Sequence, residues 1–188
     1  DMQWMFASAR AYNQDMSSWA VSSVSTMNRM FLSAYAYNQD LSSWNVGSVT
    51  DMSYMFRNAQ AYNQDISSWD VSSVTDTNQM FYQAISFNQD MSLWNVSSVT
   101  DMQRMFQSAF AFNQDLCSWG QFDSFPYNNA GSIFRDSGCN IKDQPLASVN
   151  GPFCASDCIP IVNKNGNRVS RERMFILKYH LLIHKTTA

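Results

Sequence analysis

An Asn-Gln-Asp triplet occurs five times in this chain of 188 residues, and each copy begins 25 residues after the one before. The repeated carboxylates are Asp15, Asp40, Asp65, Asp90 and Asp115. Such a column could bind calcium, which prefers oxygen ligands and would relieve the repulsion between neighbouring charges. One carboxylate per repeat, however, lacks the clustered oxygen atoms of a dedicated site. We expect these Asp side chains to accept hydrogen bonds from backbone N–H groups in turns, with no cofactor, and calcium is the alternative.

The Asn residue that opens each triplet also forms a column. Five copies in strict register indicate that each repeat is one layer of a stack, so equivalent side chains lie above one another. A stacked Asn side chain can then hydrogen-bond to the next layer. The sequence therefore predicts an Asn ladder made of Asn13, Asn38, Asn63, Asn88 and Asn113.

The four cysteines lie within or at the edge of one segment that is rich in Gly and Pro, and they are Cys117, Cys139, Cys154 and Cys158. An even number in such a segment predicts two disulfides and an oxidising compartment. From their order along the chain we expect the pairs Cys117–Cys139 and Cys154–Cys158. Zinc is the competing interpretation, because Cys154 and Cys158 have acceptable ligand spacing, although the other two form no second close pair.

Little in the sequence supports catalysis or nucleic-acid binding. The only histidines, His180 and His184, lack the Glu of the zinc-protease motif, so we expect a surface pair and no enzyme. Residues 1–119 carry a net charge of −6, residues 120–158 carry −2 and residues 159–188 carry +5. The repeats therefore offer no basic surface to nucleic acid.

Two hydrophobic periods alternate inside each repeat. Trp44 and Val46 are two residues apart, which places both on one face of a short strand. From Val49 to Ala59 the apolar residues recur at steps of three and four, as on one stripe of a helix. Ser48 followed by Asp51 is a capping signal, repeated by Ser73 with Asp76 and by Ser98 with Asp101. Each repeat is thus predicted to be a strand, a turn, a short helix and a loop.

Stacking is required because one repeat cannot bury its own Trp and Phe side chains. The Trp column is expected to point into the core with rings about 5 Å apart, and it consists of Trp19, Trp44, Trp69, Trp94 and Trp119. The predicted fold is an α/β repeat, a leucine-rich-repeat-like solenoid with parallel strands on one face and short helices or turns on the other. A disulfide-bearing C-terminal cap would close it.

These residues carry a family resemblance. The Leu-x-x-Trp-x-Val spacing of 41–46 is similar to the strand segment of leucine-rich repeats, and "FNQDMSLWNVSSVTDMQRMF" resembles the 25-residue repeat of the BspA-like surface proteins. The segment "GPFCASDC" is similar to the cysteine-bearing end of diatom members of that family. Departures from the repeat are Thr77, Leu93 and Cys117, and a Val column stands where leucine-rich repeats have Asn. The resemblance implies a surface protein of unknown function.

Three segments follow from the break in the period after Trp119. Residues 1–119 are predicted to form a five-unit stack that begins inside a repeat, residues 120–158 a cysteine-containing cap, and residues 159–188 a basic tail. The stretch Met174–His184 could be a helix, but it is too short to span a bilayer. It could dock on the cap or a membrane surface, or result from an imperfect gene model.

Small polar residues are expected on the strand face opposite the core. They are Ser17, Ser18, Ser42, Ser43, Asn45, Ser67, Ser68, Asp70, Ser92 and Asn95. The predicted function is adhesion or recognition of a protein or glycan through this face, by a non-enzymatic domain that is extracellular or on the cell surface. Asn95 also begins an Asn-x-Ser glycosylation sequon. The alternative is a structural cell-wall or ice-interface repeat without a molecular ligand.

Overall fold

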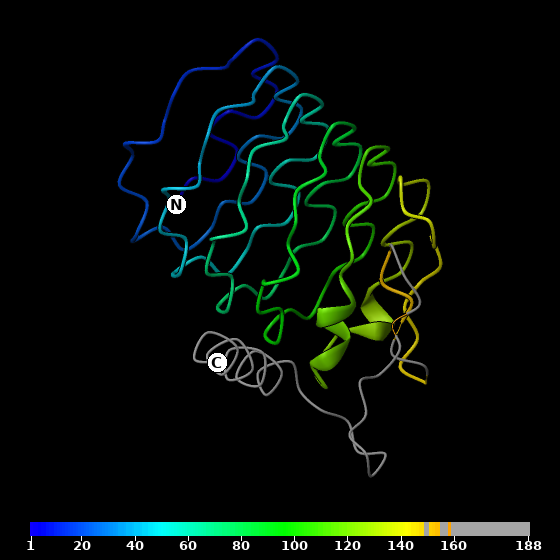
Figure 1. Ribbon diagram of the computed structural model, residues 1–188. Coiled ribbons are helices and arrows are strands. Elements are labelled where there is room, and N and C mark those ends of the chain that lie inside the picture. The colour runs from blue at the N-terminus through cyan, green and yellow to red at the C-terminus, as the bar shows by residue number, and fades with distance from the viewer. Residues whose placement is uncertain (149–150, 155–157, 159–188) are drawn as a thin grey trace, which may run out of the picture. The chain divides into compact units, whose positions relative to one another are not determined.

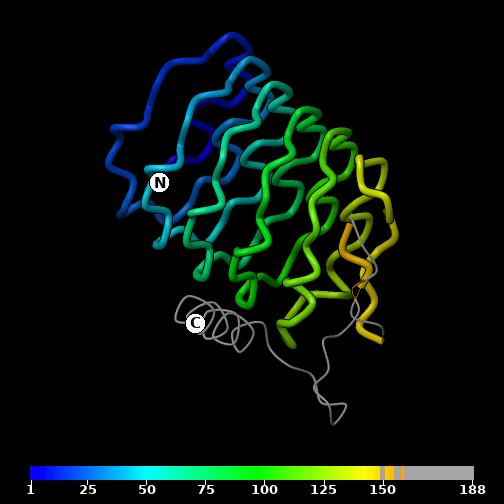
Figure 2. The backbone as a smooth tube through the Cα atoms, viewed as in Figure 1, coloured from blue at the N-terminus to red at the C-terminus, as the bar shows by residue number. Residues whose placement is uncertain are grey.

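The computed structural model describes residues 1–148, 151–154 and 158. The chain divides into two compact units, Asp1–Asp157 and Cys158–Ala188, and the description below concerns the first. In it the chain winds into successive coils that lie one behind another, from the blue N-terminal coil to the yellow segment (Figures 1 and 2). The first five coils correspond to the sequence units 1–25, 26–50, 51–75, 76–100 and 101–119.

The prediction of a leucine-rich-repeat-like solenoid with parallel strands and short helices is wrong. Within the described residues there is no α-helix and no β-strand, and the helical elements are two 3₁₀ turns, η1 (Cys117–Gln121) and η2 (Tyr127–Asn129). Parallel pairing is reduced to isolated bridges, of which one joins Thr26 to Asp51 and another joins Asp51 to Asp76.

Each unit is instead a series of tight turns closed by hydrogen bonds from residue i+3 to residue i. In the second unit the N–H of Met30 donates to the carbonyl of Met27 (3.1 Å), and that of Trp44 donates to Leu41 (3.0 Å). The residues at both ends of these two turns, Met27, Met30, Leu41 and Trp44, are buried in the core. The apolar steps of three that we attributed to a helix are therefore turn ends.

Left-handed residues explain why no helix forms between Val49 and Ala59. Tyr54 and Asn58 have φ angles of 60° and 59°, a conformation that interrupts an α-helix at both places. Tyr54 is the third residue of the turn that ends at Met55, the position where type II turns require positive φ. Arg29 and Ser33 have the same conformation in the unit before (both 57°).

Every second backbone N–H group in this segment donates a hydrogen bond to a carbonyl of the next unit. The N–H of Phe31 donates to the carbonyl of Met55 (2.9 Å), and that of Ser33 donates to Arg57 (2.8 Å). The N–H of Leu32 between them closes a turn in its own unit by donating to Arg29 (3.1 Å). Hydrogen bonds inside a unit and between units thus alternate along this segment.

Two columns of stacked aromatic rings fill the core. Phe31 and Phe56 have ring centroids 5.4 Å apart, and Tyr37 and Tyr62 are 6.1 Å apart. Within a unit the two columns touch, since the centroids of Phe56 and Tyr62 are 4.0 Å apart. All four side chains are fully buried, and burial of each large apolar side chain stabilises the fold by about 1.5–3 kcal/mol.

The Trp column lies beside the Phe column. Trp44, Trp69, Trp94 and Trp119 are at most 3% exposed, and the centroid of Trp69 is 6.4 Å from that of Phe56. Trp19 is 37% exposed, because its unit is the first of the described stack and no unit covers its outer side.

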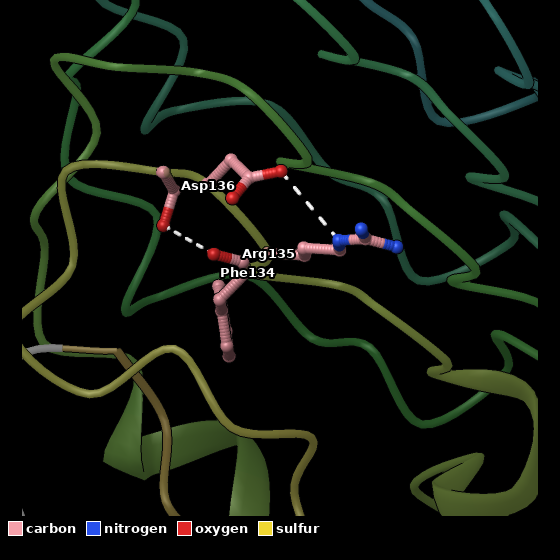
Figure 3. Close-up of polar contacts among 4 residues, drawn as sticks. Phe134, Arg135 and Asp136 are labelled. Atoms are coloured by element: carbon pink, nitrogen blue, oxygen red, sulfur yellow. Dashed lines mark hydrogen bonds and ion pairs between the residues drawn. The ribbon is translucent and has the colours of Figure 1, made fainter.

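A sixth, partial unit follows η2. Phe134 stacks on Phe106 with centroids 5.9 Å apart, and the N–H of Phe106 donates to the carbonyl of Ile133 (2.9 Å). Ser132 and Asp136 have the two positive φ angles of a complete unit (55° and 57°). The outer turn of this unit carries an ion pair between Arg135 and Asp136, 3.5 Å apart (Figure 3). The turn geometry therefore continues beyond Trp119, where the sequence period stops.

The predicted disulfide pairs are wrong. Cys139 is bonded to Cys154, with Cα atoms 4.8 Å apart, and this excludes both Cys117–Cys139 and Cys154–Cys158. The N–H of Ile141 donates to the carbonyl of Cys154 (2.9 Å), which brings the two segments together although 15 residues separate the cysteines. Cys117 and Cys158 are also disulfide-bonded, so all four cysteines are oxidised, consistent with an extracellular protein.

The predictions for the tail, including the helix Met174–His184 and the histidines His180 and His184, lie outside the described residues. In the part of the chain that the structure describes, no helix has the length and apolar character needed to cross a membrane.

Candidate functional site

The Asn column joins neighbouring units directly. Asn13 Oδ1 accepts the backbone N–H of Asn38 (2.9 Å), and the same bond recurs from Asn38 to Asn63 and onward to Asn113. The side chain of Gln39 adds to it, because its Nε2 donates to Asn13 Oδ1 (3.0 Å). The Asn and Gln of the triplet therefore act as a connection between units.

The Asp of the triplet closes a turn within its own unit. Asp15 Oδ1 accepts the N–H of Ser17 (2.8 Å), and Asp65 accepts that of Ser67 in the same way (2.8 Å). These backbone bonds lower the pKa of Asp15 and of Asp65, because they stabilise the charged carboxylate. Equivalent bonds form at Asp40, Asp90 and Asp115, so backbone N–H groups serve all five carboxylates as expected.

A second acidic column, Asp51, Asp76 and Asp101, lies where we predicted helix caps. Each carboxylate accepts the N–H of the residue two positions later, as Asp76 does from Asn78 (2.8 Å), so each closes a turn and caps no helix. Burial raises the pKa of Asp76, and the charges of Asp51 and Asp101 on either side raise it further. Among the described residues no group of three His, Cys, Asp or Glu side chains could hold a metal ion.

The Ser-rich side that we selected for ligand binding is partly used for structure. The hydroxyl of Ser43 donates to the carbonyl of Ser17 (2.9 Å), and that of Ser68 donates to Ser42 (3.3 Å). Asn45 and Asp70 accept a backbone N–H in their own turns. Ser18, Ser42 and Asn95 remain exposed, whereas Ser17, Ser67 and Ser92 are half-buried.

A shallow hollow lies beside η2. Its wall includes Thr100, Phe125, Tyr127 and Asn129, and it contains no Asp, Glu, His, Cys, Lys or Arg side chain. Its polar side chains are the hydroxyls and amides of Thr100, Ser124, Tyr127, Asn128 and Asn129.

The turn tips of the first half of each unit differ from unit to unit. We call these exposed or half-buried positions the variable surface, and they form three columns: Trp4, Arg29, Tyr54, Gln79 and Arg104; Ala7, Leu32, Arg57, Tyr82 and Gln107; and Arg10, Tyr35, Gln60, Ile85 and Phe110. The columns belong to successive turns, whose inward residues hold the core. Side chains can therefore change here without disturbing the stack.

Arginine and aromatic side chains interleave on the variable surface. The guanidinium carbon of Arg29 lies 4.7 Å from the ring centre of Trp4 and 4.3 Å from that of Tyr54. Arg57 continues the series, 5.6 Å from Tyr54 and 4.8 Å from Tyr82. We call these five residues the Arg–aromatic row, and it crosses the first four units.

A family model described as Mycoplasma protein of unknown function, DUF285, matches residues 1–78 and 43–140. The two matches together cover residues 1–140, most of the chain. The chain belongs to this family. Neither the curated proteins nor the solved structures gave a match.

Within this DUF285 chain, sequence analysis missed the variable surface. The positions that stay constant from unit to unit are core residues or connections between units. The sequence signal that could have revealed this surface is variation of the residue type at one position between units. At the positions of Arg29 and Arg57 the five units carry four and five different residue types, with Trp, Tyr and Arg among them.

Proposed function

We propose that this chain is a non-enzymatic recognition domain of a cell-surface or secreted protein and that it binds a protein or a glycan. One observation carries the proposal. The polar side chains that repeat in every unit are bonded within the stack, whereas the variable surface presents different residues on each unit. Repeat proteins bind ligands in this manner, on one side of a constant scaffold.

Two further findings support an extracellular role. All four cysteines are oxidised, as in proteins of oxidising compartments. The repeat also resembles that of the BspA-like surface proteins, although it lacks their leucine-rich-repeat strands. We infer adhesion or recognition outside the cell from the two together.

The test is a panel of secreted proteins and glycans, probed with the wild-type chain and with two variants. In the first variant Tyr54, Arg57 and Tyr82 are replaced by Ser. In the second, Ser42 and Ser92 of the Ser-rich side are replaced by Lys. We expect ligands to be lost by the first variant and kept by the second. The reverse result would move the site to the Ser-rich side, and identical binding by all three proteins would contradict the proposal.

A second candidate is a structural or ice-interface repeat. It is favoured by a row of exposed Thr side chains at unit spacing, in which the hydroxyl of Thr75 donates to Thr50 (3.1 Å) and that of Thr100 donates to Thr75 (3.0 Å). Thermal hysteresis of the purified chain tests this candidate, which predicts activity on ice without any molecular partner.

A further inference from the structure

The positive charges of the five sequence units are gathered on one surface. Residues 1–119 contain four arginines and no lysine, and all four arginines, Arg10, Arg29, Arg57 and Arg104, lie in the columns of the variable surface. None of the ten Asp residues of this segment lies in those columns. A stack with a net charge of −6 thus carries one cationic surface.

Within the described residues, no ion pair neutralises these arginines. The ion pair found in the part of the chain that the structure describes joins Arg135 to Asp136 in the sixth unit. No described carboxylate oxygen lies within 4 Å of a side-chain nitrogen of Arg29, Arg57 or Arg104. Structural arginines at a surface are often paired, so unpaired ones are available to an external anion.

The aromatic rings hold two of the arginines in place. The guanidinium of Arg29 lies between Trp4 and Tyr54, and that of Arg57 lies between Tyr54 and Tyr82. A second contact from Arg29 to Asn28 Oδ1 (2.9 Å) fixes its orientation. Because Nε of Arg57 is buried, a carboxylate would bind this side chain through its terminal N–H groups. Stacking leaves such in-plane groups to a carboxylate, and preorganisation reduces the entropy lost on binding.

The same stacking argues for a protein ligand over a sugar. Tyr54 has a guanidinium from each of two arginines against its ring, and Tyr82 has one, so these faces are already in contact with the protein. They are less available to stack on sugar rings. Trp, Tyr and Arg are also the residues that dominate the binding energy of protein–protein interfaces, while Lys and Glu, which are depleted there, are missing from the surface.

We propose that the variable surface binds an acidic segment of a partner protein, with Asp or Glu carboxylates on Arg29 and Arg57. The proposal rests on the proposed function and specifies the chemistry of the ligand. Charge complementarity supports this proposal. The arginines of the variable surface attract acidic segments, whereas the rest of the anionic stack repels them.

The experiment measures fluorescence anisotropy of a labelled twelve-residue peptide, three repeats of Glu-Tyr-Glu-Glu, with the full chain. A control peptide carries Gln at every Glu position, and polygalacturonate serves as the anionic glycan. We expect the acidic peptide to bind at least about tenfold more tightly than the Gln peptide. Its affinity should fall with added salt, because charge attraction is screened.

Variants locate the binding. R29Q and R57Q should each weaken the acidic peptide by about tenfold, since each removes charge-assisted hydrogen bonds. R135Q is the matched control, because it removes one arginine that Asp136 already neutralises, and it should change affinity less than about threefold. R57K keeps the charge but removes the planar fork, and an intermediate loss is expected. Thermal unfolding of each variant checks that the stack is intact.

The outcomes separate the two proposals. Equal binding of the Glu and Gln peptides, equal losses in R135Q and R57Q, or tighter binding of polygalacturonate would overturn the acidic-protein inference. The recognition function would survive these results if panel ligands still depended on the variable surface. If the replacement of Tyr54, Arg57 and Tyr82 changed no binding at all, both would be rejected.

Discussion

The indole Nε1 of Trp69 donates a hydrogen bond to the backbone carbonyl of Leu41, 28 residues earlier, at 3.0 Å in the buried core. The same bond joins Trp44 to Met16 and Trp94 to Ile66. The Trp column therefore contributes more than apolar area, because its indole N–H gives a buried carbonyl of the preceding unit a second donor beside the N–H of that unit's own turn.

Replacement of Trp69 by Phe should destabilise the fold by about 1–3 kcal/mol, because it removes one of the two hydrogen bonds that the Leu41 carbonyl accepts and creates a small cavity. Trp19→Phe is the matched control, since Trp19 is 37% exposed and the described residues place no acceptor at its Nε1. It should cost less than about 0.5 kcal/mol. Urea unfolding followed by circular dichroism measures both, and equal losses would contradict a role for the hydrogen bond.

Asn63→Ala should cost about 1–2 kcal/mol, because Asn63 Oδ1 accepts both the N–H of Asn88 (2.9 Å) and the Nε2 of Gln89 (2.8 Å). Asn113 ends the column, and its side chain makes no hydrogen bond within the described residues, so Asn113→Ala should be almost neutral. Thermal unfolding of the two variants compares them. A neutral Asn63→Ala would show that water replaces the ladder.

Gly138→Ala should destabilise the cap by about 1–3 kcal/mol, because the added Cβ would lie 2.5 Å from the carbonyl oxygen of Phe110 and the backbone would have to move. Gly131 provides the control, since its added Cβ would have Gln144 Oε1 as its nearest neighbour, at 3.9 Å. Gly131→Ala should change stability by less than about 1 kcal/mol. Calorimetric melting temperatures distinguish the two glycines.

Asp76→Asn should raise stability at pH 7, by less than about 1 kcal/mol because the site retains contact with water. Asn keeps the acceptor for the N–H of Asn78 and removes a charge between Asp51 and Asp101. A raised pKa means that the folded state binds the proton more tightly. The stability that the fold loses through the charged form of Asp76 is therefore zero below the unfolded pKa of 3.8. It reaches its full value above the raised pKa of the folded state.

The advantage of Asp76→Asn should consequently vanish as the pH falls below 3.8. Asp65→Asn reverses the sign, because the pKa of Asp65 is lowered and its charged form stabilises the fold at neutral pH. Unfolding curves between pH 3 and pH 7 test the pair. An advantage of Asp76→Asn that is independent of pH would exclude titration as its cause.

Removal of the Cys139–Cys154 disulfide by a double substitution to Ser should cost about 3 kcal/mol, the entropic estimate for a loop of its size. Because Cys139 and Cys154 are buried, two polar hydroxyls add to the loss, and a double substitution to Ala measures this part. Peptide mapping of the unreduced protein should recover Cys139 linked to Cys154. A peptide that links Cys117 to Cys139 would contradict the structure.

The contacts made by the Asn and Asp columns could be anticipated from the sequence, because a strict period places equivalent side chains above one another. Asn13 then meets the backbone of Asn38, and Asp15 meets its own turn, without any knowledge of the backbone path between them. Hydrogen bonds that depend only on the register between units can thus be predicted from the sequence repeat.

The backbone conformation was predicted wrongly because a spacing of three residues is close to the 3.6-residue period of an α-helix. Met52 and Met55 fit one helical stripe, but they are also the two ends of a turn whose third residue, Tyr54, is left-handed. A non-glycine residue in that conformation gives no signal in a single sequence. The cysteine pairing failed for a related reason, since Cys154 returns to Cys139 along a path that residue spacing does not encode.

The alternation of hydrogen bonds has a consequence for amide exchange. The N–H of Met55 is held inside its unit by Met52, and that of Phe56 is held across the interface by Met80. Opening one unit alone would therefore expose its own turn amides and also release amides of its neighbour. Backbone amides of adjacent units should therefore gain or lose protection against hydrogen–deuterium exchange together. The smallest segment that can open is then larger than the 25-residue repeat.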